Sequence, residues 1–172
     1  SGEKFSGKTH LVNIFLKKYN GYKLDSKLLN NSSFKEIKLH QNIILENLSE
    51  NIDEILLYTL INIIEQDNKY LIITSQNSIV DINFELNDLK SRSKNFLLVN
   101  ISKPDDDLVF ALILKNLSDR QISLDKKLIS YITKRIDRSY SKIFDFIYKI
   151  DEISLKKKKS IDLKIIKEVL GE

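Results

Sequence analysis

The sequence predicts an α/β protein built on a parallel sheet and followed by a small subdomain of helices alone. Three observations lead to this prediction. Strand-like and helix-like segments alternate along the first two thirds of the chain, a phosphate-binding motif opens it, and strand-like segments stop after about Leu124. Such alternation is typical of parallel sheets covered by helices on both faces. We therefore expect a three-layer nucleotide-binding subdomain over residues 1–122 and a helical subdomain over residues 123–172.

Three short segments have the composition of buried strands. Residues 42–45, 69–74 and 96–101 are apolar and rich in β-branched or aromatic side chains. Between and before these segments, apolar residues recur at helical spacing. This spacing predicts helices over residues 11–19 and 52–64.

Further helices are expected in the second half of the chain. A short helix is predicted over residues 86–92. Pro104 and the three aspartates after it indicate a helix start, because proline suits the first turn and carboxylates oppose the helix dipole. Three apolar helical faces define the expected helical subdomain: Leu128, Ile129 and Ile132; Tyr140, Ile143, Phe144, Ile147 and Ile150; and Ile165, Ile166, Val169 and Leu170.

Composition narrows the class of protein. With 172 residues, of which 42% are apolar, the chain can bury a core of its own. Its net charge of +4 is mildly basic, which permits nucleic-acid binding without implying it. The absence of cysteine excludes disulfides and thiolate metal sites. No apolar run is long enough to span a bilayer and no signal peptide opens the chain, so we expect a cytoplasmic protein without a membrane partner.

The opening residues match the phosphate-binding pattern G-x-x-x-x-G-K-[ST]. Gly2 and Gly7 would let the backbone curl so that its N–H groups face a phosphate, and Lys8 would add a positive charge. The hydroxyl of Thr9 could ligate Mg²⁺. A chance match is the alternative, but an amphipathic helix begins where the motif requires one. Because such a loop follows a strand, we expect the first strand to be missing from this chain.

Five segments resemble, in the same order, the signature segments of the DnaA family of AAA+ ATPases. They are Gly7-Lys8-Thr9-His10-Leu11 for the phosphate loop, residues 43–47 for the Walker B strand, residues 71–75 for the sensor 1 strand, Leu89-Lys90-Ser91-Arg92 for the arginine-finger segment, and residues 135–140 for the start of the sensor 2 helix. The second half is most similar to the Hda-like regulatory paralogues of DnaA. The resemblance implies an AAA+ parallel sheet followed by a helical lid.

The same resemblance implies roles for individual residues. It assigns Arg92 as an arginine finger that acts on nucleotide held by a neighbouring molecule. It assigns Mg²⁺ to Thr9 and Glu46, and the nucleotide, ADP or ATP, to the following set: Gly2, Gly7, Lys8, Thr9, His10 and Thr74. Two of these assignments have a structural alternative. Arg92 could be an ordinary arginine at a helix end, and Thr74 with Ser75 could simply cap a strand.

Two positions depart from the family pattern. Asn47 stands where the family has a carboxylate that polarises the attacking water, and an amide has no basic oxygen. Ser141 stands where the family usually has the sensor 2 arginine. We therefore expect nucleotide binding to survive, with weak or absent ATP hydrolysis by this chain alone.

The function implied by the resemblance is control of replication initiation. An Hda-like protein would work with the DNA polymerase sliding clamp on DNA and promote ATP hydrolysis on DnaA. Its partners would be DnaA, the clamp and DNA reached through the clamp, and a homo-oligomer is left open. One alternative is an autonomous AAA+ ATPase or clamp-loader-like motor, which Asn47 and Ser141 disfavour. Another is a non-catalytic DNA-binding or adaptor module, which the departure at Asn47 in the Walker B strand favours and the intact Lys8 and Thr9 disfavour.

Overall fold

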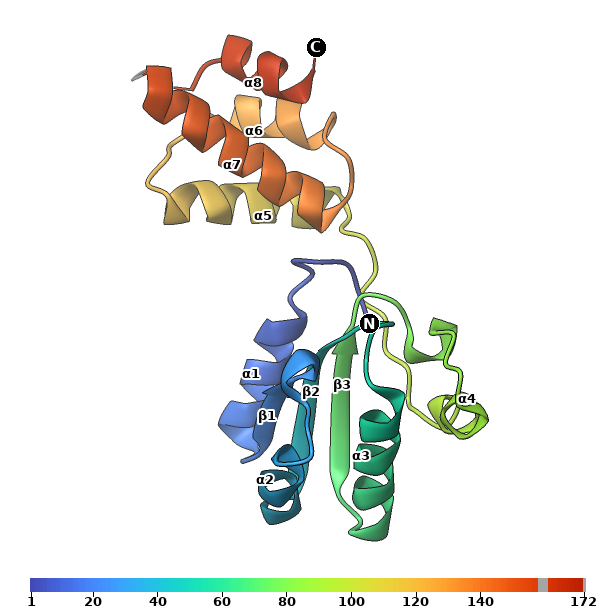
Figure 1. The fold of residues 1–172 in the computed structure, drawn as a ribbon. Helices are drawn as coiled ribbons and strands as arrows, with labels where there is room; N and C mark the ends of the chain where they lie inside the picture. The colour runs from blue at the N-terminus through green and yellow to red at the C-terminus, as the bar shows by residue number, and fades with distance from the viewer. Residues whose placement is uncertain (158–160, 172) are drawn as a thin grey trace. The chain divides into compact units, whose positions relative to one another are not determined.

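The computed structural model describes residues 1–157 and 161–171, which form two compact units (Figure 1). The α/β unit contains Ser1–Gly2 and Ser6–Ile101, and the helical unit contains Glu3–Phe5 and Ser102–Glu172. The sequence places the boundary after residue 122. In the structure, the backbone contacts divide the chain at Ile101, because the helix of residues 106–119 packs with the helices that follow it.

The α/β unit is built on three parallel strands in the order β1-β2-β3. The strands are β1 (Tyr22–Asp25), β2 (Asn42–Leu48) and β3 (Tyr70–Ser75). The predictions for β2 and β3 are confirmed. The helices of this unit are α1 (Lys8–Lys18), α2 (Ser33–Leu39), α3 (Glu54–Gln66) and α4 (Asn87–Ser93), with the short 3-10 helices η1 (Ser26–Leu28) and η2 (Ile79–Asp81).

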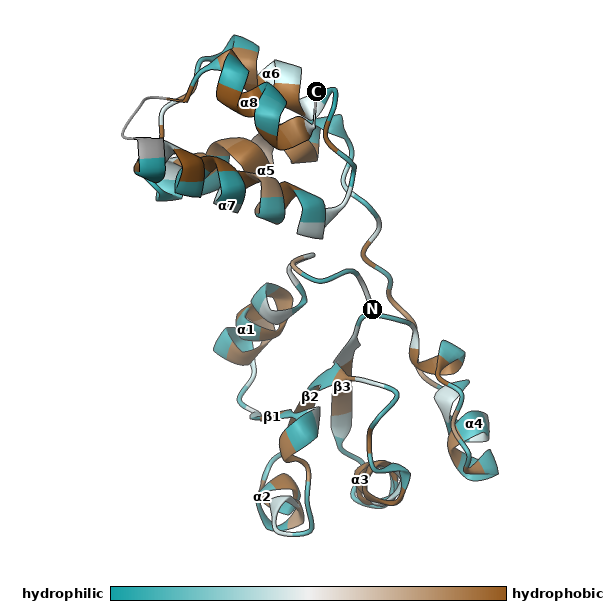
Figure 2. Ribbon diagram, turned by 45° about the horizontal axis from the view of Figure 1, so that its top comes forward, coloured by the Kyte–Doolittle hydropathy of each residue, from teal (hydrophilic) through white to brown (hydrophobic). Residues whose placement is uncertain are grey.

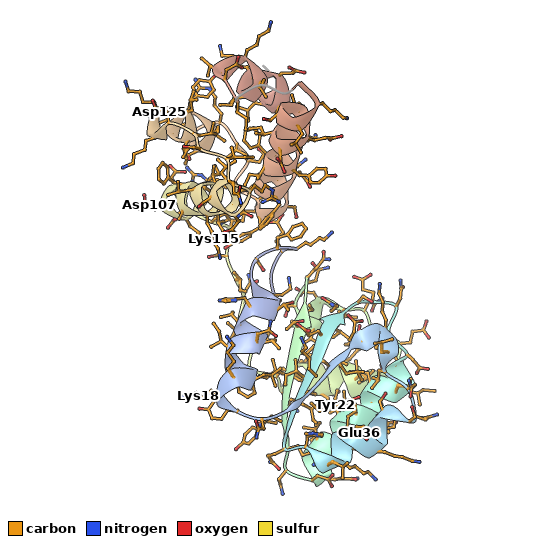
Figure 3. The ribbon with its side chains drawn as sticks, turned by 90° about the vertical axis from the view of Figure 1, so that its left-hand side faces the viewer. Lys18, Tyr22, Glu36, Asp107, Lys115 and Asp125 are labelled. Atoms are coloured by element: carbon orange, nitrogen blue, oxygen red, sulfur yellow. The ribbon has the colours of Figure 1, made fainter. Side chains whose placement is uncertain are left out.

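Helices cover both faces of the sheet, as the alternation of elements predicted. Figure 2 shows α1 on one face and α2 with α3 on the other. Ile43 and Leu45 of β2 pack with α2 and α3 in the larger core, whereas Ile44, between them, points to the opposite face. Residues 44 and 46 therefore share the face of the sheet that α1 covers. Figure 3 views the sheet from its edge, with α1, labelled at Lys18, on one side and α2, labelled at Glu36, on the other.

Two parts of the sheet differ from the prediction. The sequence analysis missed β1, because Tyr22–Asp25 carries two charged residues in four and lacks an apolar run. The predicted strand over residues 96–101 is not a strand in the structure, which has only an isolated bridge between Gly2 and Ile101. A strand needs a neighbour along its length, and here Ser1 and Gly2 alone supply one. Leu97 is accordingly 93% exposed.

The helical unit packs α5, α6, α7 and α8 around a separate apolar core. These helices span Asp106–Asp119, Lys126–Thr133, Tyr140–Lys157 and Leu163–Leu170. Each of the three helical faces predicted for the tail contributes to this core, but in α7 the core contains Phe146, whereas the predicted Phe144 stacks on Phe5. Asp105 caps α5 by accepting a hydrogen bond from the N–H of Leu108, so Pro104 lies just before the helix. Within the part of the chain that the structure describes, no helix is both long and apolar enough to cross a membrane.

Candidate phosphate-binding site

The phosphate-binding motif forms a loop that leads directly into α1. Gly7 has a φ of 92°, a left-handed conformation that favours glycine, and its carbonyl accepts the N–H of Leu11 in the first turn of α1. A Cβ atom on Gly2 would lie 2.9 Å from Oγ of Ser6 and 3.0 Å from Cβ of Ile101, so a larger residue there would require these neighbours to shift. Lys8 Nζ donates a hydrogen bond of 2.6 Å to the carbonyl of Gly2. The Lys8 ammonium therefore lies against the loop of its own motif.

The first two residues are held beside the end of β3. The N–H of Gly2 donates to the carbonyls of Ser75 and Gln76, and the N–H of Ile101 donates to the carbonyl of Ser1 at 2.9 Å. The start of the loop is thus placed between the carboxyl end of β3 and residue 101. Thr9 and His10, which follow the loop, are exposed at the beginning of α1. Their assigned contacts with Mg²⁺ and nucleotide stay predictions.

The middle of the motif belongs to the helical unit. The carboxylate of Glu3 accepts hydrogen bonds from Ser139 Oγ and from the N–H of Tyr140 at 3.0 Å, at the beginning of α7. Phe5 stacks on Phe144 of the same helix, with ring centroids 4.7 Å apart. The hydrogen bond from Ser139 is the main cause that lowers the pKa of Glu3, and Ser141 adds to it. Glu3 therefore caps α7 as a charged carboxylate, and Ser141, at the sensor 2 position, takes part in this contact.

This cap predicts a pH-dependent contribution of Glu3 to stability. The Glu3→Gln variant is expected to melt at a lower temperature than the parent above pH 4.5, the ordinary pKa of the group, because the folded protein favours the charged carboxylate. As the pH falls through the lower pKa of the folded state, the difference should disappear. Melting followed by circular dichroism across this range tests it, with Glu50→Gln, an exposed loop residue, as control. A difference that does not change with pH would contradict the assignment.

Asn47 is held by β1 and β3 at the end of β2. It has a φ of 59°, its side-chain amide donates a hydrogen bond of 2.6 Å to Asp25 Oδ2, and its N–H donates to Thr74 Oγ1 at 3.1 Å. The hydrogen bond from Asn47 is the main cause that lowers the pKa of Asp25. Thr74 is buried, and its hydroxyl oxygen accepts a hydrogen bond from the backbone. The structure therefore places Thr74 next to Asn47, and its contact with nucleotide stays a prediction.

Glu46, the predicted Mg²⁺ ligand, is paired with a lysine. Lys23 Nζ of β1 lies 3.2 Å from Glu46 Oε2, and Glu46 is only 8% exposed. Its other oxygen, Oε1, is shielded from solvent and has no hydrogen-bond partner. An octahedral, partly hydrated Mg²⁺ needs an accessible oxygen without a competing cation. The surroundings of Glu46 therefore do not fit a directly bound Mg²⁺ as they stand, and a contact with Mg²⁺ through water stays a prediction.

Arg92, the predicted arginine finger, lies in the last turn of α4 and contacts α3. Its guanidinium forms an ion pair with Glu65 and lies over the ring of Tyr58, 5.2 Å from the centroid. The hydrogen bond to Glu65 is the main cause that raises the pKa of Arg92. At the other end of α4, the Glu54 carboxylate accepts the N–H groups of Glu85 and Leu86. Two glutamates of α3 thus position α4, and a finger role for Arg92 stays a prediction.

Known proteins of similar sequence indicate the family of this chain. The family described as "Hda, lid domain" matches residues 105–170, which include all four helices of the helical unit. The replication initiator DnaA of Thermoanaerobacter sp. (strain X514) is 24% identical over 189 aligned residues, which cover 96% of this chain and 43% of DnaA. The chain is a DnaA-related AAA+ protein. It spans less than half the length of that curated relative.

Solved structures agree with the fold of this DnaA-related protein. Domain III of Thermotoga maritima DnaA superimposes with a TM-score of 0.77 at 16% identity, covering 99% of this chain and 81% of that one. AMPPCP-bound DnaA from Aquifex aeolicus gives a TM-score of 0.69 at 21% identity, covering 97% and 58%. At these identities the likeness establishes the fold alone. The predicted fold class, an AAA+ sheet followed by a helical lid, is confirmed.

Four side chains that contact residues of the family-like segments were missed in the sequence. Lys23 pairs with Glu46, Asp25 with Asn47, and Glu65 with Arg92. Glu3 lies inside the motif, at one of its unspecified positions. Each contact joins residues that the strand register or the chain path brings together. A search for cross-strand charge pairs could have found Lys23 only after β1 was recognised.

Proposed function

We propose that this DnaA-related protein regulates replication initiation by promoting ATP hydrolysis on DnaA together with the sliding clamp. The observation that carries the proposal is the match of residues 105–170 to the Hda lid domain, within a chain whose likeness to DnaA covers both units. In the proposed reaction, Arg92 reaches the γ-phosphate of ATP bound to DnaA. A guanidinium there stabilises the charge that develops during phosphoryl transfer. Because the proposed regulation of DnaA takes place on the chromosome, we also propose a cytoplasmic location.

The protein's own nucleotide site is proposed to bind ADP or ATP. The loop backbone and the Lys8 ammonium would contact the phosphates, as in other phosphate loops at a helix N-terminus. A DnaA structure with this fold is described as AMPPCP-bound, which supports the proposal. The nucleotide would serve to organise the loop and α1, while the hydrolysed ATP would be the one on DnaA.

A hydrolysis assay on DnaA tests the proposed function. DnaA loaded with radiolabelled ATP is incubated with clamp-loaded DNA, with and without the full-length protein, and the conversion of ATP to ADP is followed. We expect conversion to be faster only when the protein and the clamp are both present. Conversion at the rate of DnaA alone would exclude the regulator and favour a passive adaptor.

The protein by itself is expected to release phosphate much more slowly than about one per second, an ordinary enzymatic rate. The reason is the amide of Asn47, which donates to Asp25 and offers no base. Asn47→Asp should not restore turnover, because it places a second carboxylate against Asp25 and removes the hydrogen bond between them. Steady-state phosphate release by both proteins tests this expectation. Ordinary turnover by the parent would instead favour the autonomous motor.

A further inference from the structure

The pairing of Lys23 with Glu46 follows from the register of two parallel strands. Asp25 lies opposite Glu46 and Lys23 opposite Ile44, so Lys23 is the diagonal neighbour of Glu46 on the same face of the sheet. This is the face that α1 covers. Lys23 Nζ also lies 3.5 Å from Asn13 Oδ1 of α1. The ammonium is thereby directed at Glu46 from β1 and contacted from the helix that follows the phosphate loop.

Burial makes this pairing important for Glu46. Its side chain is 10% exposed, whereas that of Lys23 is 37% exposed. A carboxylate removed from water is costly unless a positive charge and hydrogen bonds compensate for the lost solvation. Oε1 has no hydrogen-bond partner and is shielded from solvent, so Oε2 carries the described contact. Lys23 is therefore the counter-ion of Glu46 in the folded chain.

We propose that the Lys23 ammonium takes the place of a divalent cation at Glu46, so that this protein binds ADP without needing Mg²⁺. The inference rests on the proposed nucleotide binding and names the cation requirement of that same site. Mg²⁺ binds with near-octahedral geometry and keeps several of its waters. Its approach to Glu46 would require Lys23 to leave, or would bring two cations to one carboxylate. Lys23 excludes this arrangement while it keeps Glu46 neutralised.

Binding of ADP to the full-length protein, measured by isothermal titration in Mg²⁺ and in EDTA, tests the proposal. For the parent we expect the two dissociation constants to agree within about twofold. Lys23→Met removes the resident cation, and we expect ADP to bind this variant about tenfold or more tightly in Mg²⁺ than in EDTA. Lys35→Met, which removes an exposed positive charge on α2, should behave like the parent.

A second variant and a second measurement cover the case in which Lys23→Met folds poorly. The double variant Lys23→Met with Glu46→Gln removes both charges, so it should fold and bind ADP equally with and without Mg²⁺. Melting temperatures should rise with Mg²⁺ and ADP, relative to EDTA and ADP, for Lys23→Met alone. Electron paramagnetic resonance of Mn²⁺ with ADP, compared with the same mixture without protein, should show additional protein-bound cation in that variant and not in the parent.

The outcomes separate this inference from the proposed function. A parent protein that binds ADP only with Mg²⁺, or a Lys23→Met variant indifferent to Mg²⁺, overturns the role of Lys23 and leaves regulation of DnaA intact. Metal-independent ADP binding without stimulation of DnaA would support the role of Lys23 and exclude the regulation of DnaA. If ADP binds under neither condition, the nucleotide site and the inference both fail.

Discussion

Replacing Arg92 with alanine is expected to abolish the stimulation of ATP hydrolysis on DnaA. An arginine finger can accelerate phosphoryl transfer by ~10³-fold or more, so its loss should return hydrolysis to the rate of DnaA alone. The residue lies at the end of α4, where its ion pair with Glu65 is partly exposed. Partly exposed ion pairs stabilise proteins little, so Arg92 can leave Glu65 readily and its removal should lower the melting temperature only slightly. The radiolabelled conversion assay measures the effect.

Three further variants make this result specific. Arg92→Lys should rescue little, because an ammonium lacks the planar fork that meets two phosphate oxygens. Arg138→Ala, which removes an exposed arginine paired with Asp106, should stimulate DnaA like the parent. Glu65→Gln should keep or increase stimulation, because it releases Arg92 from its partner. Full stimulation by Arg92→Ala would show that Arg92 serves only to join α4 to α3.

Replacing Lys8 with alanine is expected to weaken ADP binding to the full-length protein by about ten- to a hundredfold, the range of a charge-assisted hydrogen bond. In the structure Lys8 Nζ donates to the carbonyl of Gly2, within the loop that the phosphates would contact. Binding would exchange this carbonyl for phosphate oxygens, which the positive charge favours. Isothermal titration measures the affinity of both proteins.

A matched control for Lys8 exists on the same helix. Lys17→Ala removes an exposed lysine from the last turn of α1, ten residues from the loop. It should bind ADP as the parent does, because its charge lies away from the phosphates. Equal affinity of Lys8→Ala and the parent would remove the phosphate-loop interpretation of the first nine residues.

The elements that the sequence predicted correctly are those with a strong local pattern. The apolar faces of α3 and α7 repeat at helical spacing, and the apolar runs of β2 and β3 are bounded by polar residues. The phosphate motif also depends on neighbours in sequence, since Gly7 allows the turn and α1 follows at once. By contrast, β1 has no such local pattern. Its residues form a strand through their pairing with β2, which the local sequence does not indicate.

The sequence by itself therefore determined the fold class, the position of the candidate phosphate-binding loop and the relationship to DnaA. Only the tertiary structure decided which side chains meet. Lys23 reaches Glu46 through the register of β1 on β2, Glu65 reaches Arg92 through the packing of α4 on α3, and Glu3 reaches the start of α7 from a distant part of the chain. These contacts join residues far apart in sequence. Local propensity and periodicity report on neighbours along the chain, whereas the charge state and partners of a site depend on neighbours in space.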